Sequence, residues 1–279
     1  MALDKTAHNY EIEIVHPASG TRARIAPNRG GMATAFDVGK RSIFFLDRES
    51  FDDPTKNVRG GNPVLFPTPG KLENDKWVYG SLSGALKQHG FARNLPWQVA
   101  EQRQDTVKLL LESSDATRGA YPWDFGLTLA YSVSEGALHI LAEIENRSKT
   151  VMPFGLGFHP YFAIAQKETF ALETAATRVF DNVTKRTGPF AKEALVLGDR
   201  EVDLHLLDHG SMSVTFQCDN APITIESDLM KTWVVWTLPD RDFVCVEPWT
   251  CPGNALNTSA ALWELEPQGV GRITLAYRA

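Results

Sequence analysis

The sequence predicts an all-β protein built as a large antiparallel β-sandwich. Short segments rich in β-branched and aromatic residues run along all 279 residues, with Gly, Pro, Asn or Asp near their ends. No segment shows sustained helical amphipathicity, so we expect no long helix. Many strands without intervening helices are typical of a layered sandwich, and a β-sandwich of this length is commonly one domain, here residues 1–279.

Ten segments carry the strand pattern. They are Tyr10–Val15, Thr21–Ala26, Thr106–Glu112, Leu127–Val133, Leu138–Glu145, Ser211–Cys218, Ile223–Glu226, Thr232–Leu238, Phe243–Glu247 and Gly271–Tyr277. Two of them, Thr232–Leu238 and the run Phe243–Val246, are apolar on both faces. We therefore expect these two in the centre of the sandwich, covered on both sides.

Charge and hydropathy exclude several classes of function. The net charge is −6 and Lys and Arg form no long run, so a nucleic-acid partner is not expected. No stretch approaches the roughly 18 apolar residues of a membrane span. The N-terminal residues contain no apolar core of a signal peptide, which predicts a cytoplasmic protein.

The three cysteines are Cys218, Cys245 and Cys251. An odd, small number without an export signal indicates free thiols in a reducing compartment. The spacing of Cys245 and Cys251 matches no common zinc pattern, so we expect no metal.

One candidate site lies at Phe158-His159-Pro160-Tyr161-Phe162, after Pro153-Phe-Gly-Leu-Gly157. In an extended chain, His159 and Tyr161 share a face with Gly155 and Gly157, opposite an apolar face. The two glycines leave space on that face, and the polar groups of His159 and Tyr161 can form hydrogen bonds there, so the face suits a ligand. The alternative is a histidine satisfied within a turn.

A second candidate is Glu247, in Phe243-Val-Cys-Val-Glu247-Pro248-Trp249. Alternation places Phe243, Cys245 and Glu247 on one face, and desolvation there raises a carboxylate pKa towards the range of a general base. We expect Pro248 to end the strand and to leave Glu247 at the strand terminus. The alternative is a solvated surface glutamate.

A third candidate is the Gly- and Pro-rich region 57–94. It places donor side chains among aromatic residues, an arrangement that suits the hydroxyls and C–H faces of a sugar. The alternative is an ordinary surface loop. The donors are Arg59, Lys71, Gln88, His89 and Arg93.

Together these segments resemble the aldose 1-epimerase (galactose mutarotase-like) family. The resemblance lies in four motifs that appear in family order, with a weaker match at Phe180-Asp181-Asn182. The motifs are Arg-Gly-Gly-Asn-Pro-Val-Leu-Phe-Pro (59–67), Lys-Gln-His-Gly-Phe-Ala-Arg-Asn-Leu-Pro-Trp (87–97), Gly-Phe-His-Pro-Tyr-Phe (157–162) and Val-Glu-Pro-Trp (246–249).

The resemblance implies a galactose mutarotase-like antiparallel β-supersandwich that interconverts the α and β anomers of an aldohexose without a cofactor. It implies that Glu247 is the general base on the anomeric hydroxyl and that His159 is the general acid on the ring oxygen. It also implies that His89 and, less securely, Asp181 bind the sugar. Mutarotation needs one base and one acid, which we expect on opposite sides of the small ring.

The substrate stays open at this point. Lys71 stands where free-aldose members usually carry Arg, and Arg-Gly-Gly and His-Gly-Phe-Ala-Arg also resemble the hexose-6-phosphate mutarotase branch. Arg59 and Arg93 would bind phosphate there, or they brace the loop. A non-catalytic carbohydrate-binding sandwich is a further alternative. The expected partner is a small-molecule sugar, and the oligomeric state is either monomer or homodimer.

Overall fold

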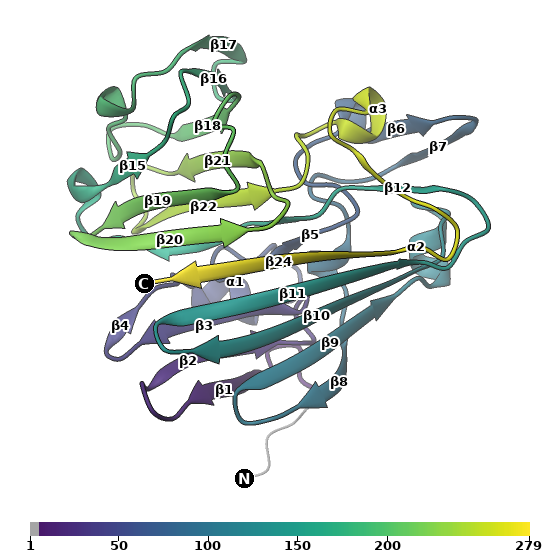
Figure 1. Ribbon diagram of the computed structural model, residues 1–279, viewed down its shortest axis with the longest axis horizontal. Helices are drawn as coiled ribbons and strands as arrows, with labels where there is room; N and C mark the ends of the chain where they lie inside the picture. Colours follow the sequence, from purple (N-terminus) through teal and green to yellow (C-terminus); the bar gives the residue numbers. More distant parts are fainter. Residues whose placement is uncertain (1–5) are drawn as a thin grey trace.

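The computed structural model describes residues 6–279, and these residues form stacked antiparallel sheets (Figure 1). The fold class predicted from the sequence is confirmed. The helices are short turns between strands. They are α1 (Arg48–Asp52), α2 (Asp115–Arg118), α3 (Ala255–Thr258) and the 3₁₀ turns η1 (Glu73–Asp75), η2 (Ala92–Asn94), η3 (Lys167–Thr169) and η4 (Lys192–Ala194). Within residues 6–279, no helix is both long and apolar enough to cross a membrane.

The first large sheet has eight strands in the order β15-β19-β20-β24-β11-β10-β9-β8. Its strands are β15 (Ala171–Glu173), β19 (Ser213–Cys218), β20 (Ala221–Ser227), β24 (Val270–Arg278), β11 (Ala137–Asn146), β10 (Phe125–Ser134), β9 (Thr106–Glu112) and β8 (Gln98–Gln102).

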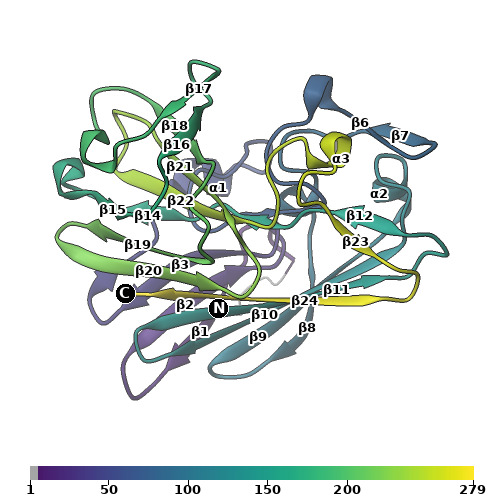
Figure 2. The same cartoon turned by 45° about the horizontal axis from the view of Figure 1, so that its top comes forward.

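The second large sheet has the order β17-β16-β18-β21-β22-β13-β5, with β14 also paired to β22. It lies over the β15–β24 half of the first sheet, as Figure 2 shows. Its strands are β17 (Arg186–Pro189), β16 (Arg178–Asp181), β18 (Val202–Leu206), β21 (Thr232–Thr237), β22 (Phe243–Trp249), β13 (Gly157–Phe158), β5 (Val64–Leu65) and β14 (Tyr161–Ala163).

Three smaller sheets complete the fold. An N-terminal four-stranded sheet contacts β9, β10 and β11 of the first large sheet, and two two-stranded sheets lie beyond the end of the second (Figure 1). The strands are β1 (Ile12–His16), β2 (Thr21–Ala26), β3 (Met32–Val38) and β4 (Arg41–Ser42), then the pairs β12 (Met152–Phe154) with β23 (Trp263–Leu265) and β6 (Lys76–Tyr79) with β7 (Leu82–Ala85).

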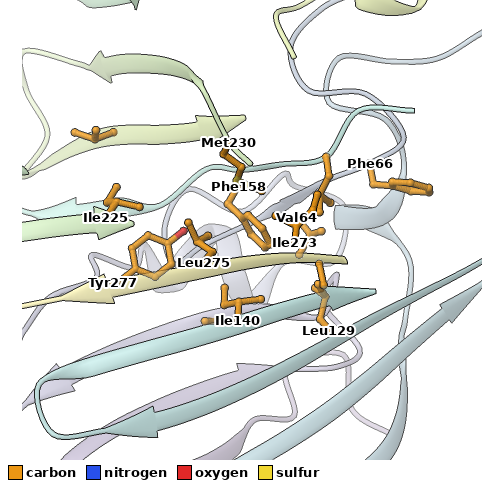
Figure 3. Packing of buried hydrophobic residues seen from close by; sticks show 14 of the residues in the cluster. Val64, Phe66, Leu129, Ile140, Phe158, Ile225, Met230, Ile273, Leu275 and Tyr277 are labelled. Carbon is orange, nitrogen blue, oxygen red and sulfur yellow. The ribbon is translucent and has the colours of Figure 1, made fainter. Parts of the chain in front are cut away.

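The core between the two large sheets consists of alternate residues from both. Phe158 of β13 points towards Ile273 and Leu275 of β24 (Figure 3), and all three are almost fully buried. On β22, Val244 and Val246 belong to this core. The opposite face of the second sheet is therefore left free to carry other chemistry.

All ten predicted strand segments form strands, with boundaries shifted by a few residues. The prediction that Pro248 ends its strand is wrong, because β22 continues to Trp249 and Pro248 pairs with Trp233. On its other side, β22 faces the break between β13 and β14. An interruption in the neighbouring strand is a place where a proline, which lacks an N–H, is tolerated.

Candidate active site

The floor of the site is the outer face of the second large sheet. Alternation along β22 turns Phe243, Cys245, Glu247 and Trp249 away from the core formed by Val244 and Val246, which confirms the predicted common face. All seven residues of β22 are buried. Glu247 thus stands on an apolar strand whose other side is covered by the first sheet.

Strand register arranges the floor in two rows. One row runs from His205 on β18 through Val234 on β21 to Glu247 on β22. The other row runs from Asp203 on β18 through Trp236 on β21 and Cys245 on β22 to Tyr161 on β14. On each of β18, β21 and β22, the residues of the two rows are two positions apart and therefore lie on the same face of the sheet. Neighbouring strands are about 4.8 Å apart, so His205 and Glu247 are separated by about 10 Å of backbone.

A cavity of about 830 Å³ lies over this floor, and loops from the N-terminal half of the chain close its other side. Eight residues predicted for the site line it. They are Arg59, Lys71, Gln88, His89, Arg93, His159, Tyr161 and Glu247. The structure thus gathers side chains from four separate sequence motifs around one space, and Asp181 is the predicted residue that is missing from it.

Glu247 is 2% exposed, and burial raises its pKa well above the usual value. The neighbouring charge of Asp203 raises this pKa further, whereas the Trp249 hydrogen bond and Arg93 oppose the shift. Nε1 of Trp249 donates to Oε2 at 3.2 Å and fixes the carboxyl orientation. A buried carboxyl with a raised pKa is suited to take and return a proton near neutral pH.

His159 is 9% exposed, and its Nε2 lies 3.4 Å from Oε1 of Glu247. Burial, and to a smaller extent the charge of Arg93, lower the pKa of His159 to about 3. The two groups predicted to act as acid and base are therefore adjacent, and the expectation of groups on opposite sides of the ring is not met. Adjacency suits the reaction that the resemblance implies, because the anomeric and ring oxygens of a sugar are bonded to the same carbon.

Burial raises the pKa of Glu247 and lowers that of His159, so it favours the uncharged form of both groups. A carboxylic acid beside a neutral imidazole and a carboxylate beside an imidazolium hold the same number of protons, so the two arrangements are forms of one protonation state. Only the position of the proton differs. The pair can therefore present a base and an acid together without exchanging a proton with solvent.

His89 lies beside this pair, with ring centroids 5.5 Å from His159 and 5.9 Å from Trp249. Its Nδ1 accepts the backbone N–H of Gly70 at 3.0 Å, which leaves the ring proton on Nε2 in the neutral tautomer. Burial lowers the pKa of His89 well below its usual value, so the ring is neutral near pH 7. The Nε2 of His89 also lies 3.2 Å from the side-chain amide nitrogen of Gln88, so His89 is a neutral donor beside both that amide and the His159–Glu247 pair.

Local backbone geometry fixes the His89 ring. His89 has φ +69° and Gly90 has φ +68°, two consecutive left-handed residues. A side chain at Gly90 would meet the carbonyl oxygen of Phe66 at 2.2 Å, so the turn requires glycine. The His-Gly pair of the 87–97 motif thus packs against the 59–67 motif.

Arg59 and Arg93 both lie close enough to Tyr161 to lower the pKa of its phenol, which burial raises. Arg93 donates to the backbone oxygen of Gln88 at 3.0 Å, and its buried Nε has no partner. Within residues 6–279, neither guanidinium forms an ion pair with a carboxylate. Two unneutralised arginines therefore converge near Tyr161, on the His159 side of Glu247.

Asp181, expected to bind sugar, lies outside this cavity. Its Oδ1 accepts the backbone N–H groups of Val183 and Thr184, and it lines a different hollow next to β17. Phe180 and Asn182, one residue to either side, line the site cavity instead. The predicted motif thus borders the cavity, but alternation along the strand turns the Asp181 carboxylate away from it.

Sequence reasoning missed Asp203, His205, Trp236 and Trp249 as lining residues. A signal for the first two was present, since Val-Asp-Leu-His-Leu at 202–206 alternates apolar and polar residues as a half-buried strand does. The glycines of the 153–157 segment were also misinterpreted. A Cβ at Gly157 would meet Cδ1 of Trp249 at 2.7 Å, so this glycine makes room for the tryptophan and not for a ligand.

His159, Cys245 and Glu247 place three potential metal-ligand atoms within 4.8 Å of one another. Imidazole, thiolate and carboxylate are the ligands that zinc takes in proteins. A cation here would occupy both groups that are predicted to act as base and acid. The absence of a metal requirement stays a prediction. The three cysteines are free and buried.

The comparison with known families decides the affiliation of the chain. The aldose 1-epimerase family model matches residues 51–278. The chain belongs to this family. The resemblance inferred from the four motifs is thereby confirmed, and the protein is an isomerase of the mutarotase type, which sets aside the non-catalytic sugar-binding alternative.

Individual relatives are more distant. Two are named "Putative glucose-6-phosphate 1-epimerase": one from Salmonella typhimurium, 27% identical over 52% of this chain, and one from Cenchrus ciliaris, 24% identical over 91% of this chain. The match spans 46% of the Salmonella protein and 75% of the Cenchrus protein. The crystal structure of Slr1438 from Synechocystis sp. PCC 6803 is 35% identical, with a TM-score of 0.92, over 96% of this epimerase and 95% of that chain.

Proposed function

We propose that this aldose 1-epimerase family member interconverts the α and β anomers of an aldohexose by ring opening, with Glu247 as general base and His159 as general acid. The observation that carries the proposal is the 3.4 Å approach of His159 Nε2 to Glu247 Oε1 in a buried site. Each well-positioned proton-transfer group contributes roughly 10²- to 10⁴-fold to a rate.

In the proposed reaction, Glu247 takes the proton of the anomeric hydroxyl while His159 gives a proton to the ring oxygen. The C1–O5 bond breaks and the open-chain aldehyde forms. Rotation about C1–C2 exposes the other face of the carbonyl. The ring oxygen then attacks that face as His159 takes its proton back and Glu247 returns a proton to O1. His89 donates through Nε2–H to a sugar oxygen and holds the ring in place.

A hexose phosphate is the second candidate substrate, and one observation favours it. Arg59 and Arg93 converge near Tyr161 with no carboxylate partner among the described residues, and guanidinium groups bind phosphate in bidentate fashion. Because C6 is attached to the carbon next to the ring oxygen, a 6-phosphate would point to the His159 side, where these arginines lie. The printed names of the two relatives agree with this candidate.

The test is polarimetry or NMR on freshly dissolved α-D-glucose, α-D-galactose and glucose 6-phosphate, with wild type and Glu247→Gln side by side. We expect wild type to accelerate the approach to anomeric equilibrium. Glu247→Gln should be slowed at least ~10²-fold while binding sugar, because it keeps the shape and removes the base. His159→Ala should also be severely slowed. Near-normal turnover by Glu247→Gln would refute the assignment of the base.

A further inference from the structure

Cys245 lies beside the acid–base pair, and the proposed chemistry does not use it. It stands on β22 two positions before Glu247, on the same face, and it pairs with Tyr161 of β14. Its side chain is fully buried in a cluster with Tyr161 and Phe243. The Cys245 sulfur, a ring nitrogen of His159 and a carboxylate oxygen of Glu247 all lie within 4.8 Å of one another. Three different donor types therefore converge at one point.

The spacing of these donors matches a tetrahedral metal site. Zinc takes nitrogen and oxygen ligands at about 2.0–2.1 Å, so two such ligands of one tetrahedron are about 3.3 Å apart. Nε2 of His159 and Oε1 of Glu247 are 3.4 Å apart. A zinc–sulfur bond of about 2.3 Å places the sulfur about 3.6 Å from the other two ligands. The Cys245 thiol therefore has to close a gap of no more than about 1.2 Å to complete three corners of the tetrahedron.

The carboxylate and the imidazole are already oriented for such a site. Nε1 of Trp249 donates to Oε2 of Glu247 at 3.2 Å, and Oε1 is the oxygen turned towards His159. A hydrogen bond of this kind is how proteins hold a ligating carboxylate in place. Imidazole binds metals in its neutral form, and burial favours that form by lowering the pKa of His159 to about 3. Nδ1 of His159 has no hydrogen-bond partner among the described residues, so the imidazole is held less firmly than the carboxylate.

Charge and ligand type favour zinc over other common cations. A zinc ion bound by the Cys245 thiolate, the Glu247 carboxylate and a neutral His159 has no net charge, and a neutral cluster is far less costly to bury than a free ion. The Zn–S bond replaces the S–H bond, and the thiol proton passes to solvent. Thiolate and imidazole bind zinc, whereas magnesium and calcium prefer oxygen ligands. The cavity lined by His159 and Glu247 gives the ion a route from solvent and room for a water as fourth ligand.

We propose that His159, Cys245 and Glu247 form a zinc-binding site, and that zinc bound there inhibits the enzyme. The bound ion occupies the imidazole and the carboxylate together, so neither can transfer a proton. The metal site stands on the geometry of its three donors, whereas the inhibition rests on the proposed function of His159 and Glu247. Because the sugar and the ion need the same two groups, zinc raises KM for the sugar and leaves kcat unchanged.

The first experiment measures zinc binding without any assay of activity. Tag-free protein, kept reduced with a phosphine because dithiols chelate zinc, is titrated with zinc chloride in a calorimeter. Cys245→Ala should weaken binding by at least about 100-fold, since loss of a mere hydrogen bond to a ligand already costs about 10- to 100-fold. Cys218→Ala is the matched control, because Cys218 is a buried free thiol on β19 of the other large sheet. It should bind zinc as tightly as wild type does.

Cobalt(II) identifies the sulfur ligand directly. Co²⁺ binds the same types of ligand as zinc, and a thiolate bound to it gives a charge-transfer absorption that nitrogen and oxygen ligands do not give. Wild type and Cys218→Ala should show this absorption. Cys245→Ser keeps the size of the side chain and should lack it, which guards against a loss of binding caused by a disturbed fold in Cys245→Ala.

Polarimetry on the accepted sugar then tests the inhibition. We expect zinc to raise the apparent KM of wild type and Cys218→Ala, and EDTA to restore the original value. Magnesium chloride at the same concentration should have no effect. Cys245→Ala should need at least about 100-fold more zinc for the same inhibition, in line with its weaker binding.

Each result bears on one part of the proposal. Zinc binding that is as tight in Cys245→Ala and Cys245→Ser as in wild type overturns the site, and so does a wild type that binds no zinc. Binding that depends on Cys245 but leaves mutarotation unchanged overturns the inhibition. If wild type accelerates no sugar, the proposed function fails, and the calorimetry and the cobalt spectra still decide whether the metal site exists.

Discussion

Nε2 of His159 lies 3.4 Å from Oε1 of Glu247, and the pocket that brings them together buries both side chains. The two residues come from different elements: Glu247 is held by β22, whereas His159 lies in the link between β13 and β14. The backbone N–H of His159 bonds to the carbonyl of Pro63. The link is thus hydrogen-bonded to the 59–67 loop, and the imidazole of His159 lies next to Glu247 on the neighbouring strand.

Burial of His159 predicts a pH dependence of stability. The unfolded imidazole takes up a proton around its ordinary pKa of 6.5, whereas the folded pKa is lowered to about 3. A depressed folded pKa contributes stability above about pH 6.5, and that stability is lost as the pH falls from there towards 3. Between pH 7 and pH 5 the loss is roughly 2 kcal/mol, at about 1.4 kcal/mol per pH unit below 6.5.

His159→Asn removes this titration and leaves the other buried histidines in place. Urea unfolding at pH 7 and pH 5 should therefore show a free energy of unfolding that falls by about 2 kcal/mol less in the variant than in wild type. The comparison is between pH values within each protein, so the cost of the substitution itself cancels. Identical pH dependence in the two proteins would show that the folded imidazole titrates normally.

A substitution at His89 tests whether its neutral imidazole acts as a hydrogen-bond donor to the sugar. Asn tolerates the left-handed backbone that position 89 requires, so His89→Asn preserves the turn while shortening the side chain. Loss of one neutral hydrogen bond to the sugar, worth about 0.5–1.5 kcal/mol, should weaken binding and lower kcat/KM by about 2- to 10-fold. The readouts are the sugar dissociation constant and the mutarotation rate. An effect on neither would make His89 a structural residue.

The parts of the site that could be predicted are those fixed by local pattern. Alternation put Cys245 on the face of Glu247, and motif order linked His89, His159 and Glu247 to one site. These local patterns could not show which of the two carboxylates, Asp181 or Asp203, faces the cavity. A shift of one residue in a strand turns a side chain to the other face, and only the pairing of β16 with β18 settles which carboxylate faces the cavity.

Arginine substitutions separate the two candidate substrates. Arg59→Ala removes a guanidinium that is exposed at the cavity rim and has no carboxylate partner among residues 6–279. If it binds a 6-phosphate, KM for glucose 6-phosphate should rise about 10- to 100-fold while KM for glucose changes little. Arg59→Lys keeps the positive charge but lacks the planar guanidinium, so its KM for glucose 6-phosphate should lie between those of wild type and Arg59→Ala. Equal changes in KM for glucose and glucose 6-phosphate would indicate that Arg59 supports the loop structure and does not bind the phosphate.

Gly157 links packing to catalysis through Trp249. An added methyl at position 157 would lie 2.7 Å from Cδ1 of the Trp249 ring, and this tryptophan donates to Oε2 of Glu247. Gly157→Ala should therefore displace the ring, destabilise the protein by about 1–3 kcal/mol and slow mutarotation, because the carboxyl loses its fixed orientation. Gly119→Ala is the matched control, since φ at Gly119 is −64° and a methyl there meets no atom within 4 Å. Thermal unfolding and polarimetry on both variants measure the effect, and a Gly157→Ala protein as stable and active as Gly119→Ala would show that Trp249 does not position the base.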